Sequence, residues 1–153
     1  MDFKTLDQSD LENVEEIFMD ASLNKDAFFT PHSFDAETAK SICSGTSKDK
    51  FFGMYIRNQN MVAYGMLRGY EEGFTTPSLG IYVHSSHRGR GYGHTMMEKL
   101  HDAAKALGST QVRLTVLKSN AKAISLYKKM GYTFDENEEK FVGVLNFFDK
   151  ESV

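Results

Sequence analysis

The sequence predicts an α/β fold in the α+β sense: a central, mixed and mostly antiparallel sheet with one parallel βαβ unit, flanked by helices. Hydrophobic periodicity along the 153 residues gives the element order β-α-α-β-β-β-α-β-α-β-β. At its centre a strand, a glycine-rich loop, a helix and a strand follow one another. Such a crossover joins parallel strands, whereas the short connections around it join antiparallel ones, so the sheet should be mixed.

Composition narrows the class of protein. The chain is 41% hydrophobic, 12% aromatic and 25% charged, which is typical of a folded domain, and its length fits a single domain over residues 1–153. The formal net charge is -3 and the basic residues are dispersed, so no nucleic-acid partner is indicated. No apolar run could span a membrane, and the single cysteine cannot form an internal disulfide. We therefore expect a cytoplasmic protein with no membrane or nucleic-acid partner.

The N-terminal half is predicted to contain two helices and four strands. In order, these are a strand at Asp2–Leu6, a helix with its apolar face at Leu11, Val14, Ile17, Phe18 and Ala21, a helix at Asp35–Cys43, and strands at Lys50–Arg57, Met61–Gly69 and Leu79–His84. The segment from Ser9 to Glu12 fits a capping box with Ser9 as the N-cap. The polar turn at 58–60 predicts an antiparallel hairpin between the second and third strands.

The C-terminal half is predicted to alternate helices and strands. In order, these are a helix bearing Met96, Met97, Leu100, Ala103, Ala104 and Leu107, a strand at Gln111–Leu117, a helix bearing Ala123, Ile124, Leu126, Tyr127 and Met130, and strands at Tyr132–Phe134 and Phe141–Phe148. Gly108 and Gly131 stand where helix C-caps belong, and Asn120 stands where an N-cap belongs.

The glycine-rich stretch from His87 to Gly93 predicts an anion site. Backbone N–H groups at the start of a helix lack intrahelical partners, and the helix dipole adds positive potential there. The stretch lacks the Gly-Lys-Ser/Thr ending of a P-loop, and its third glycine comes one residue too early for the dinucleotide fingerprint. It does fill the pattern Arg/Gln-x-x-Gly-x-Gly/Ala with Arg88, Gly91 and Gly93.

With this pattern the chain resembles the GCN5-related N-acetyltransferase (GNAT) superfamily. The stretch from Ile81 to Gly93 resembles the family's acetyl-CoA motif, and Asn120, Leu126-Tyr127 and Gly131-Tyr132 resemble its second motif. The resemblance implies the GNAT fold, acetyl-CoA as cosubstrate and no metal. The cofactor-binding residues that it implies are Ile81, Tyr82, Val83, Arg88, Gly89, Arg90, Gly91, Tyr92, Gly93, His94 and Asn120.

The resemblance also implies a mechanism. The cofactor would lie in a V-shaped split between the two parallel strands, where a β-bulge at 81–83 would free backbone N–H groups, and the amides of 89–94 would hold its pyrophosphate. A neutral amine would attack the thioester directly in a ternary complex, and Tyr127 would protonate the departing thiolate. From the residues alone, Tyr127 also fits a half-buried packing residue, and Asn120 a helix cap.

The general base stays open in the sequence. Some relatives carry a glutamate five residues before the motif asparagine, where this chain has Thr115, which is no base. The remaining candidates are Glu71, Glu72, His84 and His32, or a chain of water molecules. We interpret the histidines at 84, 87, 94 and 101 as solvated residues, because their spacing does not match a metal site.

The expected activity is N-acetylation of a primary amine in a small molecule, either a cationic amine or an aminosugar. Carboxylates at 135–139 and at Glu71-Glu72 would attract a cation, and the aromatic segment 28–34 would suit a sugar. The alternatives are a protein or peptide N-acetyltransferase and a non-catalytic acyl-CoA sensor; Tyr127 argues against the sensor. The aromatic last strand, with Phe141, Phe147 and Phe148, fits either a homodimer interface or the domain's own core.

Overall fold

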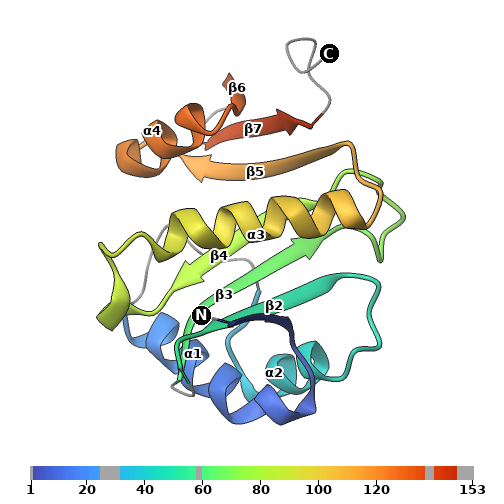
Figure 1. Ribbon diagram of the computed structural model, residues 1–153, viewed down its shortest axis with the longest axis vertical. Coiled ribbons are helices and arrows are strands. Elements are labelled where there is room, and N and C mark those ends of the chain that lie inside the picture. The colour runs from blue at the N-terminus through green and yellow to red at the C-terminus, as the bar shows by residue number, and fades with distance from the viewer. Residues whose placement is uncertain (1, 25–31, 58–59, 137–139, 148–153) are drawn as a thin grey trace.

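The computed structural model describes residues 2–24, 32–57, 60–136 and 140–147 (Figure 1). These residues form the predicted order of strands and helices, with two short 3-10 helices in addition. The elements are β1 (Asp2–Thr5), η1 (Gln8–Asp10), α1 (Leu11–Asn24), α2 (Ala36–Cys43), β2 (Lys50–Tyr55), β3 (Met61–Arg68), β4 (Ser78–Val83), η2 (Ser85–His87), α3 (Tyr92–Ala106), β5 (Gln111–Leu117), α4 (Ala121–Lys129), β6 (Thr133–Glu136) and β7 (Lys140–Asn146).

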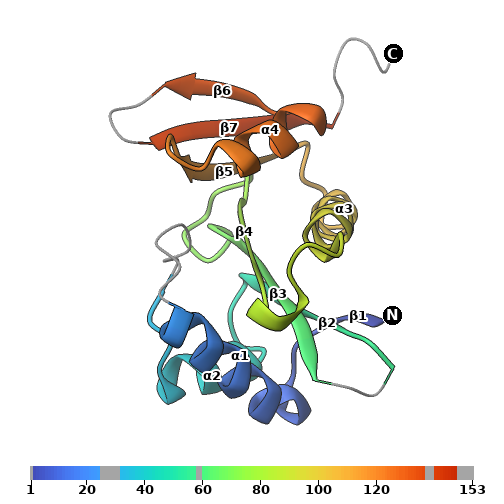
Figure 2. The same ribbon diagram turned by 90° about the vertical axis from the view of Figure 1, so that its left-hand side faces the viewer.

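The strands form one sheet in the order β1-β2-β3-β4-β5-β7-β6. Neighbouring strands are antiparallel except β4 and β5, which are parallel and are joined by α3. Helices α1 and α2 lie against one side of β3 and β4, and α3 lies against the other (Figure 2). The predicted mixed α/β fold with one parallel βαβ unit is therefore confirmed.

Two hydrophobic clusters fill the two sides of the sheet. Under α3, the stripe Met96, Met97, Leu100 and Ala104 is buried against β3, β4 and β5. On the other side, α1 and α2 bury their apolar faces against residues of β3 and β4 such as Tyr64 and Tyr82. The inward residues of β5 alternate as predicted, with Val112, Leu114 and Val116 all buried. Cys43, at the end of α2, is 2% exposed, and burial raises the pKa of its thiol to about 11.

The predicted N-cap before α1 is wrong by two residues. The N-cap is Asp7, whose carboxylate accepts a hydrogen bond from the Ser9 backbone N–H at 2.8 Å, while the Asp10 carboxylate accepts one from the Asp7 N–H at 2.9 Å. A 3-10 turn therefore precedes the helix. Asp10 is fixed there because it also accepts a 2.6 Å hydrogen bond from the Tyr55 hydroxyl and lies 2.8 Å from the Lys4 ammonium.

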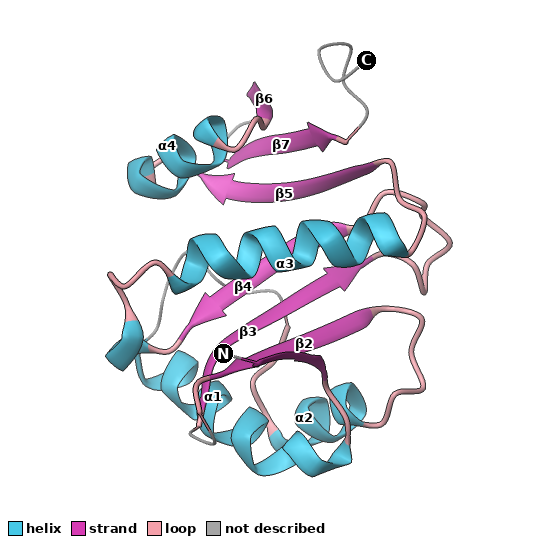
Figure 3. Cartoon of the chain, viewed as in Figure 1, coloured by secondary structure: helices cyan, strands magenta, loops and turns pink. Residues whose placement is uncertain are grey.

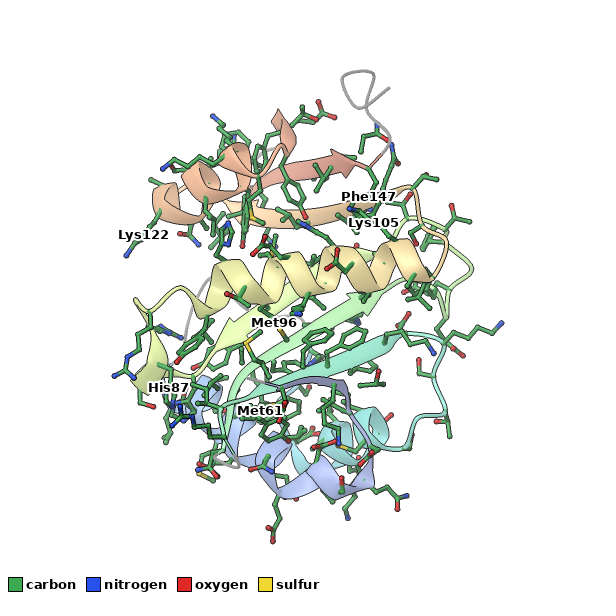
Figure 4. All side chains as sticks on the ribbon, in the orientation of Figure 1. Met61, His87, Met96, Lys105, Lys122 and Phe147 are labelled. Atoms are coloured by element: carbon green, nitrogen blue, oxygen red, sulfur yellow. The ribbon has the colours of Figure 1, made fainter. Side chains whose placement is uncertain are left out.

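The C-terminal strands also differ from their prediction. Asp135 and Glu136 belong to β6, so the predicted acidic loop at 135–139 is partly strand, and its residues 137–139 lie outside the described residues. Phe141 and Phe147 pack on the protein's own core, and the Lys105 ammonium of α3 lies 5.0 Å from the Phe147 ring centre (Figure 4). Phe148 and residues 28–31 of the aromatic segment lie outside the described residues.

Candidate active site

The parallel strands β4 and β5 separate almost as soon as they have paired. Their register contains one pair, Ser78 with Arg113, supported by a 2.9 Å hydrogen bond from the Arg113 N–H to the Pro77 carbonyl. From there the strands diverge toward their C-terminal ends, which lie beside the start of α3 and beside α4 (Figure 3). This divergence is the V-shaped split that the resemblance implied.

The edge of β4 that faces the split carries unpaired backbone groups. Because the His84 N–H donates to the Val62 carbonyl at 2.8 Å, and antiparallel partners alternate, the even-numbered residues of β4 point their backbone groups to β3. The N–H groups of Ile81 and Val83 therefore face the split, where no register pair links them to β5. The Val83 carbonyl accepts a 3.2 Å hydrogen bond from Arg88 Nε.

The bulge predicted at Ile81–Val83 is wrong, because β4 pairs with β3 in unbroken register. The register shift in this part of the sheet lies in β2, between Met54 and Tyr55. Strand divergence, and not a bulge, exposes the N–H groups of Ile81 and Val83. Tyr82 lies differently: its backbone points to β3, and its side chain is buried on the α1 side of the sheet.

The glycine loop ends at the N-terminus of α3. Gly89 and Gly91 have φ of +76° and +84°, a left-handed conformation that glycine adopts without the cost of a Cβ. Gly91 is the N-cap, and the first backbone hydrogen bond of the helix runs from the Thr95 N–H to the Gly91 carbonyl. Within the described residues no side chain caps this end, so the N–H groups of Tyr92, Gly93 and His94 are open to an anion.

The space around the glycines fits a bulky anion. A Cβ built on Gly89 or Gly91 would meet no atom within 4 Å among the described residues, so both face open space. Gly93 lies against the split instead, where a Cβ would come 3.7 Å from Val83 Cγ2. Arg90 is exposed, and the Arg88 guanidinium lies 5.2 Å from the Tyr82 ring centre. A phosphate at the helix start and an extended arm along β4 are thus compatible with acetyl-CoA.

Asp20 of α1 holds the beginning of this loop by hydrogen bonds, and no motif in the sequence pointed to it. Its carboxylate accepts hydrogen bonds from the Tyr82 hydroxyl at 2.6 Å and from the Ser85 hydroxyl and N–H at 2.6 and 2.9 Å. Burial raises the pKa of Asp20, but these hydrogen bonds outweigh it and leave the pKa below its usual value. Asp20 lies between Phe18 and Ala21, on the margin of the apolar face of α1, and that position was the available signal.

The second predicted motif lies on α4, just after the open end of β5. Asn120 is its N-cap, with Oδ1 accepting from the Ala123 N–H at 3.3 Å. Tyr127 packs against the same cluster as Ile81, Val83 and Tyr92. Its hydroxyl makes no hydrogen bond to a described residue, and burial raises the pKa of Tyr127 above its ordinary value. Tyr127 is therefore a neutral phenol whose O–H donates to none of the described residues.

The interpretation of the histidines as solvated is wrong for His101. His101 is 8% exposed, and its Nε2 lies 2.7 Å from the Tyr132 hydroxyl. His84 and His87 are half-buried, and only His94 is exposed, 3.2 Å from Glu98 Oε1. The signal for His101 was its place in the apolar stripe, one turn after Met97. The described residues contain no group of three or more His, Cys, Asp or Glu side chains arranged for a metal ion.

The structure places two of the base candidates away from the split. Glu71 and Glu72 lie in the connection between β3 and β4, beside Ser78, which is the closed end. Glu71 Oε2 there accepts a hydrogen bond from the Lys48 N–H at 2.6 Å. These two carboxylates therefore lie at the opposite end of β4 from the glycine loop, because the connection before a strand and the loop after it lie at its two ends.

The two histidine candidates have their ring nitrogens engaged. His32 Nδ1 donates to the Ser33 carbonyl at 2.7 Å, so Nε2 accepts from the Tyr64 hydroxyl at 2.9 Å, and burial lowers the pKa of His32. His84 Nδ1 accepts from the Ser86 N–H at 3.1 Å, which leaves Nε2 to face Asp20 Oδ1 at 3.4 Å. Neither ring offers a free lone pair to an amine.

A second hollow lies on the α1–α2 side of the sheet. It has a volume of about 170 Å³ and is lined by His32, Thr38, Ser41, Ile42, Asp49, Phe51 and Arg68. His32 lies there over Tyr64 of β3, and Tyr64 pairs in register with Tyr82 of β4. The residues of the sheet that line this hollow belong to β2 and β3.

Comparison with known proteins agrees with this geometry. The Acetyltransferase (GNAT) family matches residues 11–132. A thialysine N-epsilon-acetyltransferase from Sus scrofa is 36% identical over 74 residues, which cover 46% of this chain and 44% of that one, so the chain spans less than half the length of this relative. An L-methionine sulfoximine/L-methionine sulfone acetyltransferase from Salmonella typhimurium is 22% identical over 137 residues, covering 87% of this chain and 80% of that enzyme.

Solved structures share the fold. A putative acetyltransferase from Salmonella typhimurium, solved with its cofactor acetyl-CoA, superposes with a TM-score of 0.77 over 97% of this chain and 95% of that one, at 19% identity. A GNAT acetyltransferase from Streptococcus pneumoniae gives a TM-score of 0.80 over 95% of this chain and 98% of that one, at 15% identity. None of the helices within the described ranges is long and apolar enough to cross a bilayer. The family match, the split and the glycine loop agree, and the chain belongs to the GNAT family of acetyltransferases.

Proposed function

We propose that this protein is an acetyl-CoA-dependent N-acetyltransferase that acts on the primary amine of a small molecule. The observation that carries the proposal is the divergence of β4 and β5 beside the uncapped start of α3. An extended thioester arm can hydrogen-bond to the open edge of β4, while its pyrophosphate takes the N–H groups of Tyr92, Gly93 and His94.

Tyr127 is the proposed general acid. When bound, acetyl-CoA supplies an acetyl group activated as a thioester. The amine nitrogen forms a bond to the acetyl carbon, the carbon–sulfur bond breaks, and the Tyr127 hydroxyl gives its proton to the sulfur. Its raised pKa keeps that proton in place at neutral pH. The amine loses its proton to solvent, since neither of the two histidine candidates, His32 and His84, has a free lone pair.

A small amine is the favoured acceptor class. The relatives named above are enzymes for thialysine and for methionine sulfoximine, and a spermidine N-acetyltransferase from Vibrio cholerae shares the fold with a TM-score of 0.76 at 16% identity. These acceptors share a primary amine on a small, flexible carbon chain. We propose that this protein also acts on small primary amines, either cationic amines or aminosugars.

The test is thiol release from acetyl-CoA with a panel of small amines, amino acids, aminosugars and short peptides, for the wild type and Tyr127→Phe. We expect turnover with one small-amine class and a kcat at least tenfold lower in Tyr127→Phe, with the Kd for CoA unchanged within about twofold. Tyr70→Phe is the matched control. It removes a phenol bonded to Ser109 Oγ at 2.6 Å, at the closed end of the split, and should keep full activity.

The pH profile tests the acid separately. Because burial raises the pKa of Tyr127 from 10.0, kcat should rise as the amine deprotonates and should not fall again below about pH 10. A descending limb between pH 7 and 9 would contradict Tyr127 as the acid. Turnover with peptides alone would reassign the acceptor to proteins, and tight CoA binding without turnover on any acceptor would indicate a sensor.

A further inference from the structure

We infer that Tyr132 and His101 are positioning residues for Tyr127: their hydrogen bond holds the aromatic surface against which the Tyr127 ring lies. The inference rests on the proposed role of Tyr127 as general acid. It assigns a function to a buried polar pair, His101 on α3 and Tyr132 between α4 and β6, that the cofactor site does not use.

The geometry connects the three rings directly. The Tyr127 and Tyr132 ring centres are 5.7 Å apart with planes at 54°, and the His101 and Tyr132 ring centres are 5.7 Å apart at 42°. The 2.7 Å hydrogen bond joins His101 Nε2 to the Tyr132 hydroxyl. The backbone adds a second connection, because the Tyr132 N–H donates to the Tyr127 carbonyl at 3.0 Å. Tyr132 therefore touches Tyr127 through both its ring and its main chain.

The helix that carries Tyr127 needs such an anchor. None of the described residues of α4 is fully buried, whereas α3 buries five. Tyr132, in contrast, is 4% exposed, and it follows Gly131, whose φ of +102° turns the chain sharply at the end of α4. Since the Tyr127 hydroxyl has no hydrogen-bond partner among the described residues, the packing of its ring decides where its oxygen lies.

His101 is suited to hold Tyr132 permanently. The Phe147 ring lies 5.9 Å from the His101 ring, and Lys105 lies over that same phenylalanine. Burial first, and then the Lys105 charge, lower the pKa of His101 to about 4, although Asp102 and Glu98 oppose the shift. The imidazole is thus neutral throughout the range in which the enzyme can work, and the hydrogen bond to Tyr132 does not switch with pH.

The experiment is a double-mutant cycle on kcat with Tyr132→Phe and Tyr127→Phe, which keep both rings and remove only hydroxyl groups. Tyr132→Phe alone should lower kcat about five- to tenfold, with the KM for acetyl-CoA unchanged. In the Tyr127→Phe background, the same change should have no further effect, because the group that it positions is gone. Tyr70→Phe again serves as the control, since it also removes a hydroxyl with a partly buried hydrogen bond, at the opposite end of β5 from α4.

A second pair of variants protects the test against a loss of folding. His101→Gln keeps a side chain that can bond the Tyr132 hydroxyl and should retain most of kcat, whereas His101→Leu should match Tyr132→Phe. An equal loss of kcat in both backgrounds would mean a general structural role and would overturn the inference. So would full activity of Tyr132→Phe beside a slow Tyr127→Phe. If Tyr127→Phe itself is fully active, the proposed acid fails first, and the inference fails with it.

Discussion

The two edges of β4 differ in how far each is paired with the neighbouring strand. Toward β3, the register is continuous from Ala63–Val83 to Arg68–Ser78. Toward β5, it consists of the single pair Ser78–Arg113. One edge thus contributes a full ladder of hydrogen bonds to the fold, and the other leaves its N–H groups without a partner strand, open to the proposed cofactor. The difference teaches that stability and binding are divided between the two edges of one strand.

A sheet interrupted in this way needs another connection between its halves. Helix α3 provides it, because its apolar stripe is buried against β3 on one side and β5 on the other. The helix lies so close to β3 that a Cβ on Gly65 would come 2.7 Å from Met96 Cε and 2.9 Å from Leu100 Cδ1. The helix therefore does for β4 and β5 what hydrogen bonds do for β3 and β4.

The largest expected effect comes from weakening that helix. Leu100→Ala should cost about 2–5 kcal/mol of unfolding free energy, because the side chain is fully buried and leaves a cavity between the half-sheets. It should also weaken CoA binding several-fold, since α3 carries the proposed phosphate site. Denaturant unfolding and calorimetry measure the two effects.

Ile17→Ala is the matched control for this prediction. The Ile17 side chain is 1% exposed, and its truncation leaves a cavity of similar size in the cluster on the other side of the sheet. It should destabilise the protein comparably and leave the Kd for CoA unchanged. An equal change of Kd in both variants would mean that α3 has no special part in joining the half-sheets to the ligand.

A smaller effect is expected from a negative charge at the start of α3. Gly91→Asp should weaken CoA binding at least tenfold, about 1.4 kcal/mol, because a carboxylate would stand beside the pyrophosphate at the start of α3. Gly91→Asn has the same shape and tolerates positive φ, so it isolates the contribution of charge. Gly108→Asp places the same residue at φ +88° beyond the other end of α3 and should leave the affinity unchanged.

The smallest expected effect is a change in amide hydrogen exchange, which compares the two edges of β4 most directly. Amide hydrogen exchange by NMR should be fast at Ile81 and Val83 and slow at Gly80 and Tyr82, which point to β3. Saturating CoA should slow Ile81 and Val83 about tenfold or more and leave the other two amides nearly unchanged. Equal protection of all four amides in the free protein would mean that the split is closed in solution.

Much of this arrangement was predictable because local patterns determine it. The alternation of Val112, Leu114 and Val116 gave β5 its observed bounds, and Gly108 gave the end of α3. The glycine loop was predictable for the same reason, since its positive φ values admit few other residues. The element order then placed Tyr127 after the open end of β5.

The remainder depends on contacts between distant residues. The segment around α1 contains two overlapping capping patterns, and the Asp7 pattern forms because Asp10 is held by Tyr55, which is 45 residues away. No local pattern reveals that β4 and β5 form a single register pair. A bulge was therefore predicted to free the backbone N–H groups that the divergence of the strands exposes. His101 was misread for a similar reason: its partner Tyr132 is 31 residues away.

The thiol of Cys43 has a practical consequence for measuring this enzyme. It is the one cysteine in the sequence, and in the folded state it is buried, with its pKa raised to about 11. An aromatic disulfide reagent at neutral pH should therefore report the CoA that is released and give no signal from native protein. After denaturation the same reagent should titrate one equivalent per chain, so a single cuvette measures both turnover and the fraction of enzyme that was folded.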